Sequence, residues 1–265
     1  MAYIVCAAAR VIKISRDSDV RGVTSVDDEL FVLLGRDNQV AVYSINDYQL
    51  LRHLNLPGLK TSYMTSCVRH RCLYMSDFNN RCIHRYHLAS SASSKWSVPG
   101  KPLGLSVTPS CNLLVTCGEP NKLVELSADS GQCVREIALQ SDIVVPWHGV
   151  QLTTGQLVVC HGAVLNDLHQ VCVVGDDGKV TRSYGSQWGS DVGQLNYPCD
   201  LAVDKDSQFI FVADQFNDRV VLLSPTLEFV RYVSEGLSGP RHLYLHQATR
   251  RLFVGQWWDV TVIQL

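Results

Sequence analysis

Four side chains carry groups that could do chemistry if the fold brings them together: Arg21, His148, Cys199 and Arg241. Two neighbouring guanidinium groups would attract a carboxylate or a phosphate, because arginine forms paired hydrogen bonds with such planar anions. An imidazole beside a thiol could activate the cysteine as a nucleophile or bind a metal ion with it. Whether either chemistry is possible depends on the elements that carry these residues.

An internal repeat supplies those elements. Its clearest copy begins at residue 197 with an apolar strand, continues through a second strand at 209–212 and a polar turn, and ends with strands at 219–223 and 228–233. The second strand recurs as apolar segments at residues 30–33, 73–76, 113–116, 156–159 and 252–255. A repeat of about 40–45 residues that contains four short strands is typical of a propeller blade.

The sequence therefore predicts an all-β fold, a six-bladed β-propeller with four-stranded antiparallel blades that forms one domain over residues 1–265. The last repeat reaches only its third strand at Leu265, whereas residues 2–14 precede the first repeat. We expect the N-terminal strand, residues 2–14, to complete the last blade and close the ring, because closure removes exposed sheet edges.

The composition restricts the location and the partners. Hydrophobic residues make up 46% of the chain, charged residues 18%, and the net charge is −2. This charge disfavours a DNA-binding protein and leaves RNA as a weaker alternative to a protein partner. No apolar run is long enough to span a membrane. Ten cysteines without a CxxC pair or an export signal predict reduced thiols in a cytoplasmic protein.

Alignment of the repeats places six residues on one ring at the start of the innermost strands: Arg21, Thr61, Leu103, His148, Cys199 and Arg241. Arg21 and Arg241 belong to the first and last repeats, which become neighbours when the ring closes. His148 and Cys199 come from adjacent blades. We therefore predict His148 and Cys199 as candidate catalytic residues, and the two arginines as candidate ligands for an anion.

Two acids allow a structural interpretation of the same residues. The arginines could pair with Asp19 or Asp200, and Cys199 could be a buried filler. Asp200 and His242 belong to the same strand starts, and we include both among the candidate ligand-binding residues.

Aromatic residues gather in the loops expected at the same face. Trp257 and Trp258 occupy the turn of the last blade, and Trp147 adjoins His148. Tryptophan offers a large apolar area with a polar N–H group, so these three residues are candidates for a contact surface. The alternative is that they pack beneath the connector at residues 184–197.

One repeat carries a specific motif. The segment Tyr197-Pro198-x-Asp200-Leu201-Ala202-Val203-Asp204, followed by Val212-Ala213-Asp214-x-x-Asn217-x-Arg219-Val220, resembles a repeat of the NHL family. The resemblance implies a propeller whose turns are anchored by residues such as Asp214 and Asn217, with Arg219 in a structural role. It also implies one of two activities. NHL propellers of tripartite-motif ubiquitin ligases dock RNA or protein, whereas a similar propeller in peptidyl-hydroxyglycine amidating lyase is a zinc enzyme.

The zinc chemistry of that lyase can be tested on this sequence. The family places zinc-binding histidines just before the innermost strands, and only His148 matches here. Zinc needs three or four converging ligands. The segment Cys67-x-x-His70-x-Cys72 offers three, but it straddles a predicted turn and lacks a fourth. The sequence therefore predicts no metal site and no cofactor.

Two functions remain. The first is a recognition module that binds a protein or peptide, or alternatively single-stranded RNA stacked on tryptophans, at the mouth of the channel. The second is an enzyme that acts on a small anionic substrate in the channel. Arg21 and Arg241 would then hold the anion, and His148 would act as general acid or base. Fold alone does not choose between them.

Overall fold

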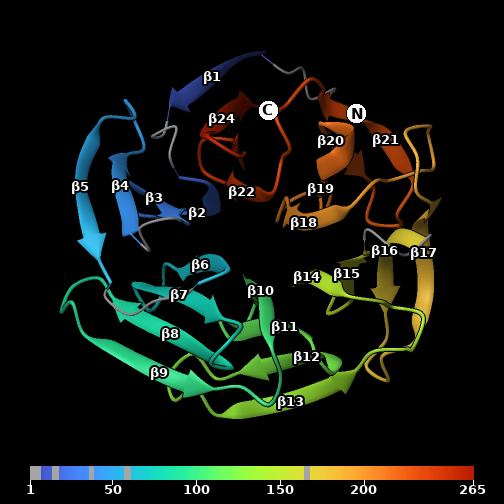
Figure 1. The fold of residues 1–265 in the computed structure, drawn as a ribbon, viewed down its shortest axis with the longest axis horizontal. Helices are drawn as coiled ribbons and strands as arrows, with labels where there is room; N and C mark the ends of the chain where they lie inside the picture. The colour runs from blue at the N-terminus through green and yellow to red at the C-terminus, as the bar shows by residue number, and fades with distance from the viewer. Residues whose placement is uncertain (1–6, 14–17, 36–38, 57–60, 164–167) are drawn as a thin grey trace.

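The computed structural model of the chain describes residues 7–13, 18–35, 39–56, 61–163 and 168–265. These residues form six four-stranded antiparallel sheets arranged in a ring (Figure 1). The predicted fold, a six-bladed β-propeller, is therefore confirmed.

The first three blades follow the chain from the innermost strand to the outermost strand. Blade 1 contains β2 (Val20–Val26), β3 (Glu29–Leu34), β4 (Gln39–Ser44) and β5 (Leu50–Asn55). Blade 2 contains β6 (Tyr63–Cys67), β7 (Cys72–Asp77), β8 (Cys82–His87) and β9 (Ser93–Ser97). Blade 3 contains β10 (Pro102–Val107), β11 (Leu113–Gly118), β12 (Asn121–Leu126) and β13 (Cys133–Ala138).

The last three blades include the one that joins the two ends of the chain. Blade 4 contains β14 (Pro146–Gln151), β15 (Leu157–His161), β16 (Leu168–Val174) and β17 (Val180–Gln187). Blade 5 contains β18 (Pro198–Val203), β19 (Ile210–Asp214), β20 (Arg219–Leu223) and β21 (Phe229–Ser234). Blade 6 contains β22 (His242–His246), β23 (Arg251–Gly255), β24 (Asp259–Gln264) and, at its outer edge, β1 (Ala7–Lys13).

The ring closes through the pairing of β1 with β24. The two strands are antiparallel, and Val11 lies opposite Thr261 in the ladder. The expected closing strand spans residues 2–14, and its residues 2–6 and 14 lie outside the described part of the chain. This pairing covers the edge of β24 and makes β1 the outermost strand of blade 6.

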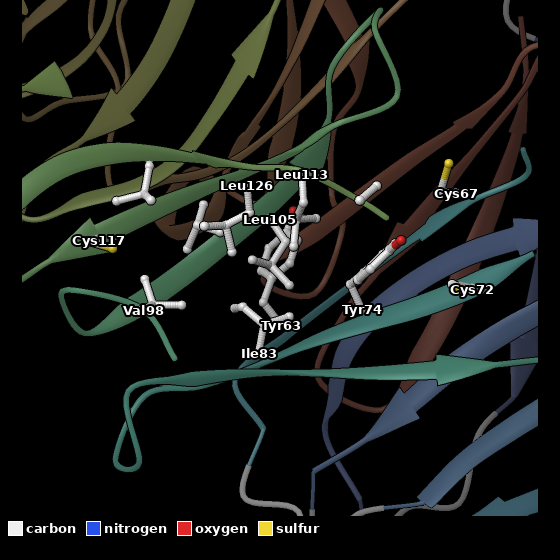
Figure 2. Packing of buried hydrophobic residues seen from close by; sticks show 13 residues of the cluster. Tyr63, Cys67, Cys72, Tyr74, Ile83, Val98, Leu105, Leu113, Cys117 and Leu126 are labelled. Atoms are coloured by element: carbon white, nitrogen blue, oxygen red, sulfur yellow. The ribbon is translucent and has the colours of Figure 1, made fainter. Parts of the chain in front are cut away.

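The core lies between the blades. The second strands are buried on both faces, so their sequences are continuous apolar runs: every residue of β19 is buried. The outermost strands face solvent, and most of β5 is exposed. Figure 2 shows one interblade cluster, in which Tyr74 and Ile83 of blade 2 pack with Leu105 and Leu113 of blade 3. Each blade thus depends on its neighbours to cover its faces.

The NHL-like motif of blade 5 forms one hydrogen-bonded network. Asp214 accepts hydrogen bonds from Asn217 Nδ2 at 2.8 Å and from Arg219 Nε at 2.7 Å. Asn217 also donates to the backbone carbonyl of Gly189, and Arg219 donates to that of Ser190. The network ties the connector before β18 to the blade, which is the structural role expected of these side chains.

No helix in the described part of the chain is long and apolar enough to cross a membrane.

Candidate functional site

Four side chains from four different blades meet in the middle of the channel. The strand ladders place Tyr63, His148, Asp200 and His242 at the same level, because each lies opposite the corresponding residue of its second strand. Tyr63, Asp200 and His148 are 8%, 0% and 3% exposed, and His242 is 8% exposed. We call these four residues the central cluster.

The strand pairing corrects the repeat alignment from the sequence, which placed His148 and Cys199 at equivalent positions. His148 is equivalent to Asp200, so the residue equivalent to Cys199 is Trp147, one position earlier. The error arose because the apolar Val150 was matched with Leu201, whereas the ladder matches Leu201 with Gly149. A shift of one residue moves a strand side chain to the opposite face.

A second shift of the same kind affected blade 2. There the repeat alignment treated the apolar Tyr63 as a core residue equivalent to Leu201 and placed Thr61 on the ring. The ladder places Tyr63 at the level of Asp200 instead. Tyr63 was therefore missed as a candidate residue, although correct register alone would have identified it.

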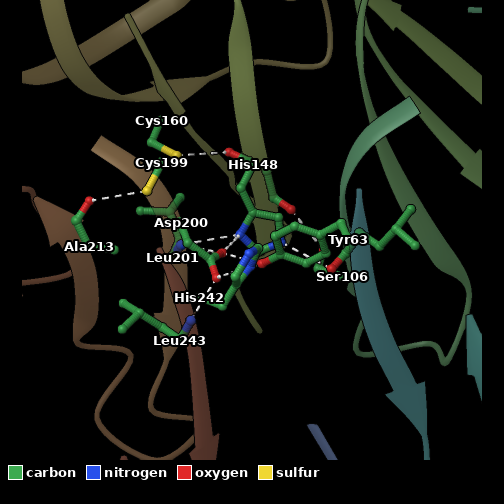
Figure 3. A network of polar contacts seen from close by, with 12 residues as sticks. Tyr63, Ser106, His148, Cys160, Cys199, Asp200, Leu201, Ala213, His242 and Leu243 are labelled. Atoms are coloured by element: carbon green, nitrogen blue, oxygen red, sulfur yellow. Dashed lines mark hydrogen bonds and ion pairs between the residues drawn. The ribbon is translucent and has the colours of Figure 1, made fainter. Parts of the chain in front are cut away.

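Asp200 is the centre of the cluster, as Figure 3 shows. Its Oδ1 atom accepts hydrogen bonds from the Tyr63 hydroxyl and from the backbone N–H of Leu201, the latter at 2.7 Å. Its Oδ2 atom accepts a 2.7 Å hydrogen bond from the backbone N–H of Leu243. His148 Nδ1 lies 2.6 Å from Oδ1. This fully buried carboxylate thus accepts hydrogen bonds from blades 2, 5 and 6, and His148 of blade 4 lies in contact with it.

Both ring nitrogens of His148 are engaged. Nδ1 faces Asp200, and Nε2 donates to the backbone carbonyl of Leu105 at 3.1 Å, since a carbonyl oxygen can only accept. His148 is therefore held as part of the fold, with both nitrogens directed at protein atoms.

His242 differs from His148 in its contacts. Its Nδ1 lies 3.9 Å from Asp200 Oδ2 and makes no hydrogen bond with the described residues. Burial lowers the pKa of His242 to about 4, despite the opposing charge of Asp200. Its ring lies 5.0 Å from that of Tyr63, centroid to centroid. At neutral pH the described surroundings therefore hold His242 as an uncharged imidazole.

The central cluster separates two cavities. One, of about 470 Å³, lies at the end of the channel where the turns between the second and third strands gather, and Phe78, Glu119 and Gln215 of those turns line it. We call it the upper cavity. The other, the lower cavity, measures about 520 Å³. Tyr63 and His242 line both cavities.

Most of the predicted site residues line one or both of these cavities, whereas Trp257 and Trp258 line neither. The upper cavity is lined by Arg21, Arg241, Cys199, Trp147 and His242, so strand starts and turns border the same cavity. His148 and Asp200 line the lower cavity instead.

The two arginines of the upper cavity share one acid. Arg21 Nε donates to Asp19 Oδ2 at 3.0 Å, and Arg241 Nη1 lies 3.9 Å from the same oxygen. The side chains of Arg21 and Arg241 are 39% and 30% exposed. Two guanidinium groups therefore face one carboxylate, which leaves one positive charge and several N–H donors open to a ligand.

Aromatic rings pack against Arg241 and form part of the lining of the upper cavity. The guanidinium carbon of Arg241 lies 4.2 Å from the centre of the Trp257 ring, a cation–π contact. Trp147 donates its indole N–H to the carbonyl of Gly162 at 2.7 Å and packs on Tyr197. Trp258 is 49% exposed.

The predicted Cys199–His148 pair does not form a reactive thiolate. Burial, reinforced by the negative charge of Asp200, raises the pKa of the Cys199 thiol well above its usual value. The thiol lies 3.6 Å from the backbone carbonyls of Pro240 and Arg241. Cys199 lines the upper cavity and His148 the lower one, so the described geometry gives no nucleophile–base arrangement.

No protein-family model matches the sequence, and no curated protein matches it either. Many solved structures are similar in fold. Virginiamycin B lyase from Staphylococcus aureus has a TM-score of 0.68 and 10% identity, with 97% of this chain and 99% of that chain covered.

A protein of unknown function from Bacteroides thetaiotaomicron has a TM-score of 0.74 and 14% identity, and the match covers 97% of this chain and 75% of that one. The propeller domain of Cps50 (Swd1) from Myceliophteria thermophila has a TM-score of 0.64 and 10% identity, with coverages of 93% and 83%. At these identities the likeness establishes the β-propeller fold alone.

Proposed function

We propose that this propeller is a recognition module that binds an acidic segment of a peptide or protein in its upper cavity. The observation that carries the proposal is the pair of exposed guanidinium groups, Arg21 and Arg241, around the single carboxylate of Asp19. An aspartate, a glutamate or a terminal carboxylate of the ligand would supply the missing negative charge with paired hydrogen bonds.

The size and lining of the cavity support a peptide ligand. A cavity of about 470 Å³ accommodates a few side chains, and its wall combines these arginines with the rings of Phe78, Trp147 and Tyr197. Trp257, which contacts Arg241, and the exposed Trp258 that follows it in the chain would extend the contact to flanking ligand residues. Single-stranded RNA fits less well, since RNA affinity usually requires several phosphate contacts.

Three further assignments belong to this proposal. We propose that the propeller is of NHL type, which the Asp214–Asn217–Arg219 network supports. We treat residues 1–265 as one domain, supported by the pairing of β1 with β24. A cytoplasmic location is supported by the cysteines, all of which are free in the described part of the chain.

The proposal can be tested by selecting peptides from a random displayed library on the immobilised protein. We expect enriched sequences to carry an acidic residue next to aromatic residues, and to bind the double variant Arg21→Ala/Arg241→Ala about 100-fold more weakly. Thermal melts of the variant serve as the folding control. Selected peptides without acidic residues, or with equal affinity for both proteins, would contradict the proposal, as would binding of a single-stranded RNA oligomer alone.

The position of His242 in the upper cavity favours a second candidate function, catalysis on a small anionic substrate. His242 lines the upper cavity, is held neutral by its lowered pKa, and has a ring nitrogen without a hydrogen bond to the described residues. It could accept a proton from an anionic substrate held by the arginines, a role that the contacts of His148 do not allow. An activity found by screening small carboxylates and phosphates should then be lost in His242→Gln, whereas loss of activity only in His148→Gln would exclude this mechanism.

A further inference from the structure

Blades 2 and 5 place an aspartate at the same point, the end of the second strand, but pair it with different residues. In blade 5, Asp214 lies opposite Arg219 in the ladder. In blade 2, Asp77 lies opposite Cys82. Both carboxylates are fully buried, with 0% of each residue exposed. Each blade therefore has to compensate a buried negative charge, and the residue opposite the aspartate differs between the two.

In blade 5 the buried carboxylate of Asp214 is compensated by arginine, which stays protonated in proteins. The Arg219 guanidinium lies 2.7 Å from Asp214 Oδ2, and its side chain is only 6% exposed. A buried carboxylate without such compensation would be strongly destabilising, because desolvation disfavours its charged form.

Blade 2 has no arginine at this place. The side chain opposite Asp77 is the Cys82 thiol, and the nearest basic group is the imidazole of His84, two residues further along β8. His84 Nε2 lies 3.1 Å from Asp77 Oδ2, and Cys82 Sγ lies 3.7 Å from His84 Nε2. The three ligand atoms all lie within 4.8 Å of one another. Cys82 and His84 are each 8% exposed.

The sulfur–nitrogen and nitrogen–oxygen separations fit two edges of a metal tetrahedron. With zinc bonds of about 2.3 Å to sulfur and about 2.0–2.1 Å to nitrogen and oxygen, tetrahedral geometry places sulfur and nitrogen about 3.6 Å apart, and nitrogen and oxygen about 3.3 Å apart. A thiolate, an imidazole and a carboxylate together are a donor set suited to zinc. We propose that Asp77, Cys82 and His84 bind a zinc ion, with water as the fourth ligand.

The surroundings of Asp77 orient it for this role. The backbone N–H of Asn80 donates to Asp77 Oδ1 at 3.0 Å, and the Asn80 side chain donates to Oδ2 at 2.8 Å. Hydrogen bonds of this kind fix the orientation of ligating carboxylates in metal sites. The turn that Asp77 and Asn80 anchor also carries Phe78, which lines the upper cavity. The ion would hold this part of the cavity wall in place.

Metal binding would change the protonation state of Cys82. Burial, with the added negative charge of Asp77, raises the pKa of the Cys82 thiol. The metal-free site therefore holds the thiol, and zinc forms its bond to sulfur as the S–H proton is released to solvent. The zinc cation then replaces, beside Asp77, the positive charge that Arg219 supplies in blade 5.

The test is a titration of the metal-free, reduced protein with Co²⁺ and with Zn²⁺. We expect one equivalent of Co²⁺ to produce a near-ultraviolet charge-transfer band from the thiolate together with the visible bands of tetrahedral cobalt, and Zn²⁺ to abolish both. Cys82→Ser and His84→Ala should lose the charge-transfer band. The matched control is Cys172→Ser, because Cys172 Sγ lies 3.5 Å from His161 Nε2 in a buried Cys–His pair of blade 4. It should retain the band.

Two results would overturn the proposal, and the first does not depend on any variant folding. One is the absence of stoichiometric Co²⁺ and Zn²⁺ binding by the wild-type protein. The other is a charge-transfer band that persists in Cys82→Ser or disappears in Cys172→Ser, which would place the metal elsewhere. Circular dichroism of each variant identifies any loss that comes from unfolding.

Discussion

The two ends of the channel are built from different chemistry although they share the central cluster. At the upper end, Arg21 and Arg241 share one acid and remain partly exposed. The lower cavity is lined by hydroxyl groups that are already paired, since Thr24 Oγ1 lies 2.6 Å from Ser66 Oγ and Ser106 donates to a backbone carbonyl at 2.8 Å. Its exposed charges, Arg69 and Lys205, lie at the rim. Exposed charge with unused donors can bind a ligand, whereas groups already paired gain little from one.

The difference shows how one scaffold separates stability from recognition. The central cluster joins four blades through Asp200 and is almost fully buried, so we assign it to the stability of the ring. The upper cavity lies directly above it and is lined by strand starts and turns, which can vary without changing the blades. Three sets of variants test this division, in order of expected effect.

The largest effect should come from Asp200→Asn. The substitution removes the charge that accepts hydrogen bonds from Tyr63 and two backbone N–H groups, and it directs an amide NH₂ group at donors. We expect a loss of about 3–5 kcal/mol in the free energy of unfolding, measured by urea denaturation. Tyr63→Phe, which removes a single donor, should cost about 1–2 kcal/mol. A smaller loss in Asp200→Asn than in Tyr63→Phe would show that the carboxylate does not organise the cluster.

The next effect is a loss of stability in acid. Because the folded protein lowers the pKa of His242 to about 4, the unfolded chain binds a proton there at a higher pH than the folded chain. Stability should therefore fall as the pH drops from about 6.5 towards about 4, by about 3 kcal/mol from this residue. His161, whose pKa burial also lowers to about 4, adds to the same window.

His242→Gln should reduce the slope of unfolding free energy against pH in that window by up to about 1.4 kcal/mol per pH unit, the value for one proton. His161→Gln is the matched comparison at a buried histidine outside the central cluster. An unchanged slope in His242→Gln would mean that His242 binds its proton at the same pH in the folded protein as in the unfolded chain.

A smaller effect is expected at the upper end for Trp257→Ala. The Trp257 ring lies 4.2 Å from the Arg241 guanidinium, so its removal frees the arginine to move. A cation–π contact at a partly exposed site contributes about 0.5–1 kcal/mol, which corresponds to roughly 2–5-fold weaker binding of a selected acidic peptide. Trp257→Phe should retain most of the affinity. If Trp257→Ala binds as tightly as wild type, the ring does not position Arg241.

The sequence was sufficient for the fold because apolar segments and turns recur at the blade interval. It also brought Arg21 and Arg241 together, since ring closure makes the first and last repeats neighbours. The sequence was insufficient to predict which residues form the central cluster. There, a register error of one residue at Val150 and at Tyr63 exchanged ring and core positions, because apolar residues occur on both faces of these buried strands.

The Asp77–Cys82–His84 cluster was missed for a different reason. Its spacing matches none of the usual zinc motifs, and the three residues converge only because β7 and β8 pair across a turn. Comparison of this turn with the one in blade 5, where arginine replaces cysteine, would have been a usable signal. Local motif spacing does not report contacts made across a ladder.

The most direct test of the account compares the affinity of one selected acidic peptide for two double variants by fluorescence anisotropy. Arg21→Ala/Arg241→Ala removes the upper charges, and Arg69→Ala/Lys205→Ala removes two exposed basic residues from the rim of the lower cavity. We expect about 100-fold weaker binding for the upper variant, from about 1.5 kcal/mol or more per charged hydrogen-bonding group, and unchanged binding for the lower one. Equal losses in both variants, or a loss only in the lower one, would contradict recognition at the upper cavity.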